Sequence, residues 1–442
     1  MEEVNLPTKN FQLISLPKKE GMMKFGTDGL RGRFGSVITT DLAYDFGVAF
    51  AASRMATSAS VTLAVARDTR TSGDRLEAYL VAGMMRPGVN VIITGVMPTA
   101  ALSHFILEKG LQGGIMITAS HNPPEDNGLK PLNHLGEKLT AEERASVEDY
   151  FGFKPSETHL SGTSHEISSG WIPWMKKIWS FIKESGAENS LIGEKIAVDG
   201  ANGAGRFLIG QALSPFGAKI LSIGTGDGER INVNCGSLHP EKMVSTVLAS
   251  GAIAGIALDG DGDRIQICDR WGKLYDGDDI LWLLRGRSKA IVGTVMSNEG
   301  LLQSLRGEGI HLHRAAVGDA NVAASMKELG ATIGGEPSGH ILIDGGMPTS
   351  CGVFTAAKLL SLNPKMWRFN LDGFSRTYQA TGKVPAQDIS HLDQKIEELS
   401  AANLRVVVRA SGTEPVIRLM VEGEDKEKAE GGLASLLNDL RG

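Results

Sequence analysis

Five short segments of this 442-residue sequence carry side chains that can do chemistry, and a run of aspartates is the most specific of them. Asp259, Asp261 and Asp263 alternate with glycines (DGDGDR) directly after an apolar stretch. Three carboxylates at this spacing can surround one hard cation with oxygen ligands. A calcium loop would need Gly at its sixth position and Glu at its twelfth, where this chain has Arg264 and Arg270. The run therefore indicates a Mg²⁺ site, with a structural acidic turn as the alternative.

A second segment offers a nucleophile. Ser120 lies within residues 118–124 (TASHNPP), which follow an apolar run at 114–117. We therefore expect its hydroxyl to be exposed on a loop at the end of a strand. A serine alone is weak evidence, because most serines in turns are simply solvated. Lys130 follows ten residues later, and a partly buried ammonium group can act as an acid or a base, or can bind phosphate.

Two further segments are suited to a sugar phosphate. Residues 334–340 (GGEPSGH) contain glycines that let the backbone approach a ligand, and polar side chains suited to hydroxyl groups, although a turn between strands is the alternative. These polar side chains are Glu336, Ser338 and His340. Residues 409–418 lie between two strand-like runs and combine guanidinium, hydroxyl and loop N–H groups, which match phosphate oxygens. A solvated hairpin loop is the alternative here. The phosphate-binding candidates are Arg409, Ser411, Gly412, Thr413 and Arg418.

A fifth segment, residues 24–32 (KFGTDGLRG), is a basic, glycine-rich turn. Its Arg31 can reach the same site, unless the segment is an ordinary β-turn. Together the five segments supply a nucleophilic hydroxyl, a cation site, positive charges and two ligand loops. Phosphoryl transfer requires this combination, since its transition state is stabilised by positioning and by positive charge around the transferred oxygens.

The helices and strands predicted around these segments indicate an α/β protein. Apolar runs of strand length alternate with helical patterns, which is typical of βαβ units and largely parallel sheets. The strand-like runs are residues 61–66, 89–94, 114–118, 195–198, 255–258 and 290–296. In such sheets ligands bind beyond the carboxyl ends of strands, where the serine and aspartate segments lie. Residues 140–143 (TAEE) form a capping box that opens a helix.

The length implies three or four domains, because single hydrophobic cores rarely grow beyond ~250–300 residues. A stretch rich in Ser, Thr, Gly and His at 155–170 indicates the first boundary, and weaker signals lie near 254 and 364. We expect domains at residues 1–160, 161–254, 255–365 and 366–442. The aspartate run would then lie at the start of the third domain.

Composition narrows the class of protein. A formal net charge of −6 argues against nucleic-acid binding, which needs a basic face. The three scattered cysteines, Cys235, Cys268 and Cys351, fit free thiols in a reducing compartment. The first 21 residues lack the apolar run of a secretory signal, and no apolar stretch reaches the ~20 residues that cross a bilayer. We expect a cytoplasmic enzyme, monomeric or homodimeric, that acts on a small molecule and binds neither membrane nor nucleic acid.

The sequence resembles the α-D-phosphohexomutase family over residues 23–423. The motifs that carry the resemblance occur in the family's order: residues 25–32, 119–123 (ASHNP), 126–130 (DNGLK), 259–264 and 409–418. Within the family, the sequence most resembles the branch that acts on glucosamine phosphates. That likeness rests on residues 25–29 (FGTDG), 231–237 (INVNCGS), 293–298 (GTVMSN) and the SGT form of the last loop.

The resemblance implies three α/β domains with mixed, largely parallel sheets and a smaller C-terminal α+β domain, arranged around a central cleft. It implies that Ser120 is a phosphoserine and that its phosphate, with Asp259, Asp261 and Asp263, binds one Mg²⁺. It also implies catalytic roles for Ser120, Lys130 (as general base), His340, Arg31, His121 and Arg264. Substrate-binding roles are implied for Glu336, Ser338, Arg409, Ser411, Gly412, Thr413 and Arg418.

The implied reaction interconverts glucosamine 6-phosphate and glucosamine 1-phosphate and feeds UDP-N-acetylglucosamine synthesis. A sugar 1,6-bisphosphate would be its intermediate and activator. Three positions depart from the family: Pro337 replaces a Gln, Ala320 an Arg, and Cys351 a carboxylate. The alternatives are a phosphomannomutase or phosphoglucomutase of the same fold, or a non-catalytic paralogue that binds sugar phosphates.

Overall fold

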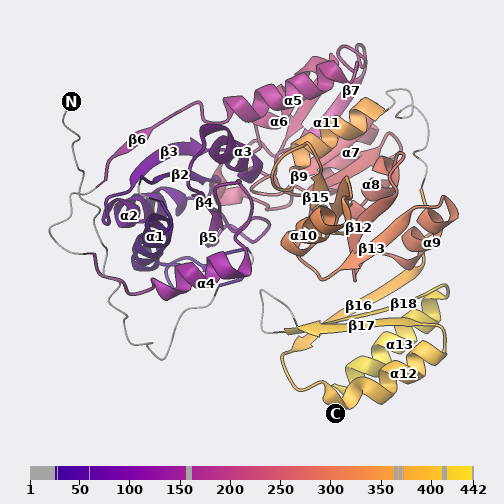
Figure 1. Ribbon diagram of the computed structural model, residues 1–442. Coiled ribbons are helices and arrows are strands. Elements are labelled where there is room, and N and C mark those ends of the chain that lie inside the picture. Colours follow the sequence, from indigo (N-terminus) through magenta and orange to yellow (C-terminus); the bar gives the residue numbers. More distant parts are fainter. Residues whose placement is uncertain are drawn as a thin grey trace, which may run out of the picture.

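The computed structural model describes residues 25–26, 28–58, 60–155, 162–362, 367, 371, 373–410 and 416–440. Four sheets follow one another along this part of the chain, each with its own helices (Figure 1). The first three mix parallel and antiparallel pairing, and the fourth is antiparallel. The α/β class expected from the sequence is confirmed.

The first sheet has six strands in the order β1-β5-β4-β2-β3-β6. Its strands are β1 (Leu30–Arg33), β2 (Thr62–Arg67), β3 (Asn90–Val96), β4 (Gly114–Ile117), β5 (Asp126–Leu132) and β6 (Ser164–Glu166). Its helices are α1 (Thr40–Met55), α2 (Gly73–Met85), α3 (Thr99–Lys109) and α4 (Ala141–Asp149). The capping box expected at residues 140–143 is confirmed at the start of α4.

Both faces of this sheet are covered, which explains why its strands read as continuous apolar runs. Residues of alternating parity along β2 enter two different cores: Leu63 packs with α1 and α2, whereas Ala64 packs with α3. Helices α1 and α2 approach closely because both have glycine at the crossing. A Cβ at Gly83 would lie 2.1 Å from the carbonyl oxygen of Tyr44.

The second sheet has five strands in the order β11-β10-β9-β7-β8. Its strands are β7 (Lys195–Asp199), β8 (Lys219–Ile223), β9 (Ala254–Leu258), β10 (Ile265–Asp269) and β11 (Leu274–Tyr275). Its helices are α5 (Ile172–Glu184), α6 (Leu208–Ala212) and α7 (Glu241–Ser250). The boundary expected at residues 254–255 does not coincide with the sheets, because β9 pairs with β7 in this sheet. The aspartate run therefore connects β9 to β10 within the second sheet.

The third sheet has the order β13-β12-β14-β15 and the fourth the order β16-β18-β17. The strands of the third sheet are β12 (Ala290–Thr294), β13 (His311–Ala315), β14 (Ile333–Gly335) and β15 (Ile341–Ile343), with helices α8 (Gly277–Leu284), α9 (Glu299–Gly307), α10 (Asp319–Leu329) and α11 (Gly352–Leu362). The fourth unit contains β16 (Tyr378–Pro385), β17 (Arg405–Ala410), β18 (Val416–Gly423), α12 (Asp393–Ala401) and α13 (Lys426–Asp439).

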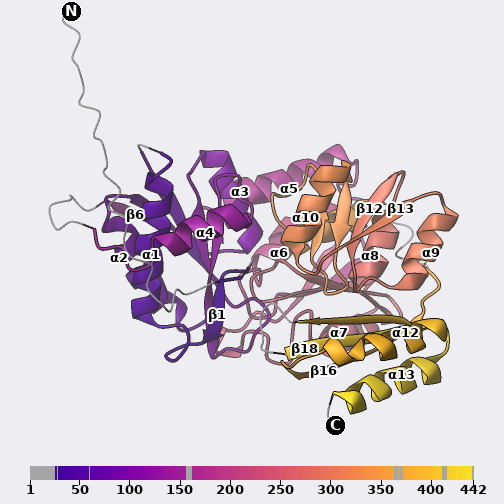
Figure 2. The ribbon, with the colours of Figure 1, turned by 60° about the horizontal axis from the view of Figure 1, so that its bottom comes forward.

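The fourth unit lies beside the third, and its helices cover the face of its sheet turned away from the rest of the molecule (Figures 1 and 2). The three cysteines are buried free thiols, as expected. Among the described residues, no helix has both the length and the apolar composition that crossing a membrane requires.

Candidate active site

The serine loop (residues 118–124) follows β4, as expected, but Ser120 is only 1% exposed. The expectation of an exposed hydroxyl is wrong, because residues from other parts of the chain close over the loop. The Oγ of Ser120 donates a 2.5 Å hydrogen bond to Oδ2 of Asp259. The serine backbone is left-handed (φ 52°), a conformation that is strained for a residue with a side chain. The hydroxyl therefore points at the aspartate run.

The aspartate loop (residues 259–263) holds its three carboxylates together in the interior. Oxygen atoms of Asp259, Asp261 and Asp263 lie within 4.8 Å of one another, and all three residues are buried. The glycines between them are required: Gly262 has φ 73°, and a Cβ at Gly260 would lie 2.5 Å from the carbonyl oxygen of Ser120. The alternation seen in the sequence thus folds into a carboxylate cluster against the serine loop.

This cluster fits a divalent cation. The Oδ1 atom of Asp261 is buried and has no hydrogen-bond partner in the part of the chain that the structure describes, so one carboxylate oxygen is left for a ligand. Burial and the neighbouring carboxylates of Asp263 and Asp261 raise the pKa of Asp259 to about 8. A group so destabilised in its charged form favours the nearby binding of positive charge. Oxygen-only donors of this kind are those preferred by Mg²⁺.

Lys130 lies on β5 and is completely buried beside this cluster. Its Nζ donates to Oδ2 of Asp261 at 2.8 Å and to Oδ2 of Asp263 at 2.6 Å. Burial by itself lowers the pKa of Lys130, but the two carboxylates outweigh it and hold the pKa above the usual value for lysine. In this arrangement Lys130 is an ammonium group, and therefore an acid and a source of positive charge.

The loop at residues 334–340 meets the aspartate loop through His340. Its Nε2 lies 3.0 Å from Oδ1 of Asp263, and its Nδ1 lies 3.0 Å from Oε2 of Glu336. Burial lowers the pKa of His340, yet these carboxylates outweigh the effect and raise it to about 10. His340 is therefore an imidazolium that donates both N–H groups. The Nε of Arg264 lies 3.2 Å from the same Nε2 but cannot donate to it in that state.

Glu336 is held between two elements, since its Oε1 accepts from the backbone N–H of Gly318 at 2.9 Å. Ser338 lies on the same loop and is exposed. Pro337 occupies the intervening position, and its carbonyl oxygen accepts from the N–H of Gly277, the first residue of α8. The 334–340 loop is thus fixed at Glu336 and His340 and exposed at Ser338.

Arg31 and His121 complete the charge pattern. The guanidinium group of Arg31 lies 3.6 Å from the carboxylate of Asp28, and its buried Nε has no hydrogen-bond partner within the described ranges. Burial by itself lowers the pKa of Arg31, but Asp28 and the aspartate loop raise it. Nδ1 of His121 lies 3.4 Å from Oγ of Ser120. Burial and the guanidinium groups of Arg264 and Arg31 lower the pKa of His121 to about 3, so its ring is neutral.

The phosphate-binding candidates lie on the fourth sheet. Arg409 and Arg418 are opposite one another on β17 and β18. Burial and the charge of Arg418 lower the pKa of Arg409, while Glu336 acts in the opposite direction across the two units. The buried Nε of Arg409 has no hydrogen-bond partner among the described residues. Ser411, Gly412 and Thr413 fall outside the described residues.

The structure also places two of the departures from the family pattern. Cys351 is buried in the core where α11 begins, and its Sγ accepts from the N–H of Phe354. Burial raises the pKa of its thiol to about 11. Ala320 lies in the first turn of α10, next to Asp319, which pairs with Lys138. Cys351 is therefore a packing residue.

Sequence reasoning missed several residues around the site. Thr99, at the start of α3, donates from its hydroxyl to Oδ2 of Asp261 at 2.7 Å. Lys138 bridges Asp28 and Asp319, and so joins the first unit to the third. Only the position of Thr99 just after a strand-like run could have indicated it from the sequence.

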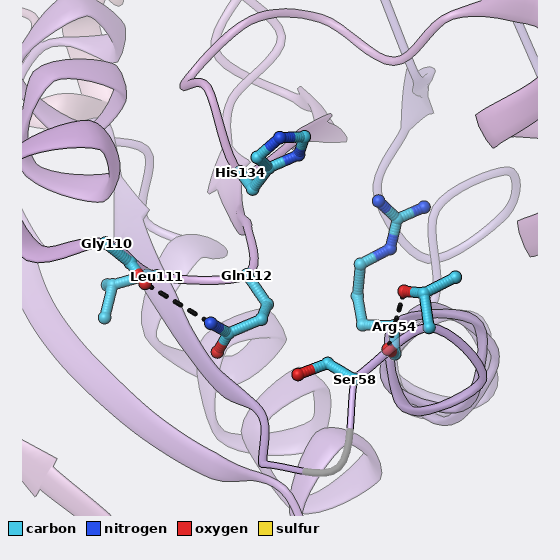
Figure 3. Close-up of a pocket in the computed structure, with 7 residues that line it drawn as sticks. Arg54, Ser58, Gly110, Leu111, Gln112 and His134 are labelled. Carbon is cyan, nitrogen blue, oxygen red and sulfur yellow. Dashed lines mark hydrogen bonds between the residues drawn. The ribbon is translucent and has the colours of Figure 1, made fainter.

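A cavity of about 280 Å³ lies elsewhere in the first unit, between α1 and the ends of α3 and β5 (Figure 3). Three of its polar side chains are already engaged: Arg54 pairs with Glu143, the Ser58 hydroxyl donates to the carbonyl oxygen of Ser60, and the Gln112 side chain donates to that of Gly110. None of the site residues named above lines it. This cavity is therefore separate from the serine and aspartate loops.

Family comparisons match the order of these units. The phosphoglucomutase/phosphomannomutase alpha/beta/alpha domain I matches residues 22–155, alpha/beta/alpha domain III matches 276–366, and the C-terminal domain matches 376–438. The chain is 37% identical to phosphoglucosamine mutase of Carboxydothermus hydrogenoformans, covering 92% of this chain and 96% of the relative. It is also 37% identical to a phosphoglucosamine mutase of Thermus thermophilus, covering 91% and 94%.

Solved structures show the same fold. A phosphoglucomutase/phosphomannomutase family protein from Burkholderia thailandensis superposes with a TM-score of 0.75 at 23% identity, covering 94% of this chain and 96% of that one. N-acetylphosphoglucosamine mutase of Aspergillus fumigatus, solved with GlcNAc-6P and magnesium, gives a TM-score of 0.64 at 16% identity, covering 95% and 96%. This chain thus belongs to the phosphoglucomutase/phosphomannomutase family of α-D-phosphohexomutases and is an isomerase that transfers phosphoryl groups.

Proposed function

We propose that this enzyme is a phosphoglucosamine mutase that interconverts glucosamine 6-phosphate and glucosamine 1-phosphate. The observation that carries the proposal is the 2.5 Å hydrogen bond from Ser120 to Asp259 inside the carboxylate cluster. It joins a nucleophilic oxygen to a set of cation ligands, which phosphoryl transfer needs. The curated relatives named phosphoglucosamine mutase support the choice of sugar.

In the proposed reaction, Ser120 carries a phosphoryl group and gives it to a free hydroxyl oxygen of the sugar phosphate. The bond from phosphorus to the serine Oγ breaks as the bond to the sugar oxygen forms. The bisphosphorylated sugar then turns, and its other phosphoryl group returns to Ser120. A sugar 1,6-bisphosphate is accordingly both the intermediate and the activator that can charge an unphosphorylated enzyme.

The charged side chains have different roles in the proposed reaction. Lys130 and Arg31 supply positive charge beside the cluster, and the His340 imidazolium is oriented by Asp263 and Glu336. A divalent cation, held by the Ser120 phosphate and the three aspartates, would stabilise charge on the transferred oxygens and lower the pKa of Lys130 toward that of a base. Lys130 is then the residue that exchanges a proton with the sugar hydroxyl.

Binding of the substrate is assigned to the third and fourth units. Glu336 and Ser338 would contact sugar hydroxyls or the amino group, because one is a carboxylate near the cluster and the other is exposed on the same loop. Arg409 and Arg418 would bind the phosphate that is not being transferred, together with the loop at 411–413. The neutral ring of His121 would support the serine loop, and Arg264, whose backbone N–H donates to Asp259, would support the aspartate loop.

Kinetics with three substrates test the proposal. We expect kcat/KM for glucosamine 6-phosphate to exceed that for glucose 1-phosphate and mannose 1-phosphate by at least about tenfold, which corresponds to about 1.4 kcal/mol. A preference for either neutral sugar would reassign the enzyme to the phosphoglucomutase or phosphomannomutase activities of the family. Binding of sugar phosphates without any turnover, in a preparation charged with sugar bisphosphate, would instead indicate a non-catalytic protein.

A further inference from the structure

The backbone of the serine loop is held by two side chains that the proposed chemistry does not use. Arg70 lies in the segment after β2, and its side chain is fully buried. Its guanidinium group donates to the carbonyl oxygens of Ser120 at 2.9 Å and Asn122 at 2.8 Å. It also donates to the carbonyl oxygens of Pro123 and Asp126. One side chain thus reaches four carbonyl groups in and beside the loop.

Asp68 orients this arginine and reaches the loop by a second route. Its Oδ2 accepts from Nε of Arg70 at 3.0 Å and from the hydroxyl of Thr118 at 2.6 Å. The Thr118 oxygen in turn accepts from the backbone N–H of Ser120 at 2.8 Å. The five N–H donors of Arg70 are then all used. The carbonyl oxygen of Ser120 accepts from Arg70, and its N–H is connected to Asp68 through the Thr118 hydroxyl, so both backbone groups are held by the same ion pair.

Asn232 contacts the same carbonyl groups from the second unit. Its Nδ2 donates to the carbonyl oxygen of Ser120 at 2.8 Å and to that of Asn122 at 3.0 Å. The two units are closely packed nearby, where the hydroxyl of Thr69 donates to the carbonyl oxygen of Asn202 at 2.6 Å. Each of the two loop carbonyls therefore accepts one hydrogen bond from each unit.

We propose that Arg70 and Asn232 are positioning residues that hold the nucleophile in its reactive geometry. Neither touches the reacting oxygen. A left-handed serine persists only when its surroundings over-determine it, and four hydrogen bonds to two anchoring carbonyls, those of Ser120 and Asn122, do so. The result is that the Oγ of Ser120 remains directed at Asp259 rather than at solvent. This inference rests on the proposed role of Ser120 as the phosphoryl carrier.

The test is Asn232→Gly, with Asn234→Gly as the matched control. Both asparagines have left-handed backbones (φ 60° and φ 52°), which glycine adopts without strain, but the Asn234 side chain is exposed. We expect Asn232→Gly to lower kcat by about 10- to 100-fold with KM changed less than about threefold, because a small misplacement of reacting groups has such an effect. Asn234→Gly should retain wild-type kcat.

Hydrogen exchange supplies a readout that does not depend on turnover. We expect the amides of residues 118–122 to exchange about 5- to 10-fold faster in Asn232→Gly than in Asn234→Gly, because the loop loses the two hydrogen bonds from Asn232. Equal exchange and equal kcat in the two variants would overturn the positioning role. If wild-type enzyme showed no turnover while exchange still differed, the proposed function would fail and the loop anchoring would stand.

Arg70→Lys gives a second variant that keeps positive charge beside Asp68 while losing the fork that reaches four carbonyls. We expect the same pattern in this variant, with kcat lowered and amide exchange of residues 118–122 increased. A folded Arg70→Lys protein with wild-type kcat and exchange would exclude the arginine from the positioning role.

Discussion

Ser120 and Asp259 are 139 residues apart in the chain, yet the Oγ of Ser120 donates a 2.5 Å hydrogen bond to the carboxylate of Asp259. The contact joins the loop after β4 of the first sheet to the loop after β9 of the second sheet. Both loops therefore lie at carboxyl ends of strands, as the α/β class requires of a ligand site.

The first prediction concerns the hydroxyl itself. Ser120→Ala should lower mutase kcat by at least about 10³-fold, because the proposed covalent carrier is lost. The fold should be retained, since the hydrogen bonds recorded for the removed oxygen among the described residues are those with Asp259 and His121. Steady-state assays and thermal unfolding by circular dichroism check both statements. Ser36→Ala removes an exposed loop hydroxyl and serves as the control. Substantial turnover in Ser120→Ala would remove this residue from the mechanism.

The second prediction concerns the cation. Mg²⁺ should raise the thermal unfolding temperature of chelator-treated enzyme, because a ligand at about 100 times its Kd stabilises the folded state by about 2.7 kcal/mol. Chelation should also abolish turnover, and Mg²⁺ should restore it. Asp261→Asn removes one carboxylate charge and should weaken Mg²⁺ binding by at least about tenfold in calorimetric titration.

Asp45→Asn is the control for this experiment, since Asp45 is an exposed carboxylate on α1. It should leave the Mg²⁺ affinity unchanged. The cation assignment would be rejected by turnover that survives exhaustive removal of metal, or by an Asp261→Asn protein that binds Mg²⁺ like the wild type.

The third prediction concerns pH and stability away from the site. Burial lowers the pKa of His104 on α3, although Glu108 acts in the opposite direction, and Lys177 on α5 adds to the lowering. A histidine whose folded pKa lies below its unfolded value contributes stability that is present above the unfolded pKa, near 6.5, and is lost as pH falls below it. Acidification from pH 7.5 to 5.5 should therefore lower the free energy of unfolding.

His104→Asn removes the titrating group and should show a smaller loss of stability over this range. His311→Asn is the control, because His311 is exposed on β13. Denaturant unfolding at the two pH values measures the difference. A variant with the same pH dependence as the wild type would contradict the assignment to His104.

Local patterns predicted the elements of this fold well, while contacts between distant segments decided what the patterns missed. The capping box at Thr140 and the glycines of the aspartate loop act within a few residues, so they are readable from the sequence. The burial of Ser120 could not be predicted from the sequence, because Arg70 and Asn232, which contact its loop, come from other parts of the chain. The domain boundary predicted at residues 254–255 falls within the second sheet for the same reason. The apolar run of β9 does not reveal that this strand pairs with β7.

The protonation of Lys130 could not be predicted from the sequence either. From the residues alone Lys130 could be an acid, a base or a charge that binds phosphate, and only the family resemblance implied the role of general base. The two carboxylates that contact its Nζ belong to the aspartate loop, more than 130 residues away. Their charge raises the pKa of Lys130 against the effect of burial, so the group is protonated.

The last prediction concerns how the fourth unit is attached. Glu422 on β18 is buried and accepts from Nε of Arg405 at 2.7 Å, from the backbone N–H of Glu299 at 2.7 Å, and from the hydroxyl of Thr377. Arg405 also donates to the carbonyl oxygens of Val295 and Ser297. This network fixes the sheet that carries Arg409 and Arg418 against β12 and α9 of the third unit.

Glu422→Gln keeps the shape but loses the charge, and weakening such charged hydrogen bonds costs about 1–3 kcal/mol. We expect a lower unfolding temperature and a several-fold higher KM for the sugar phosphate, with kcat less affected, because the phosphate-binding arginines lose their fixed placement while the serine and aspartate loops are untouched. Glu424→Gln lies two residues further on, is exposed, and should change neither quantity. Equal KM in the two variants would show that the attachment of the fourth unit does not limit substrate binding.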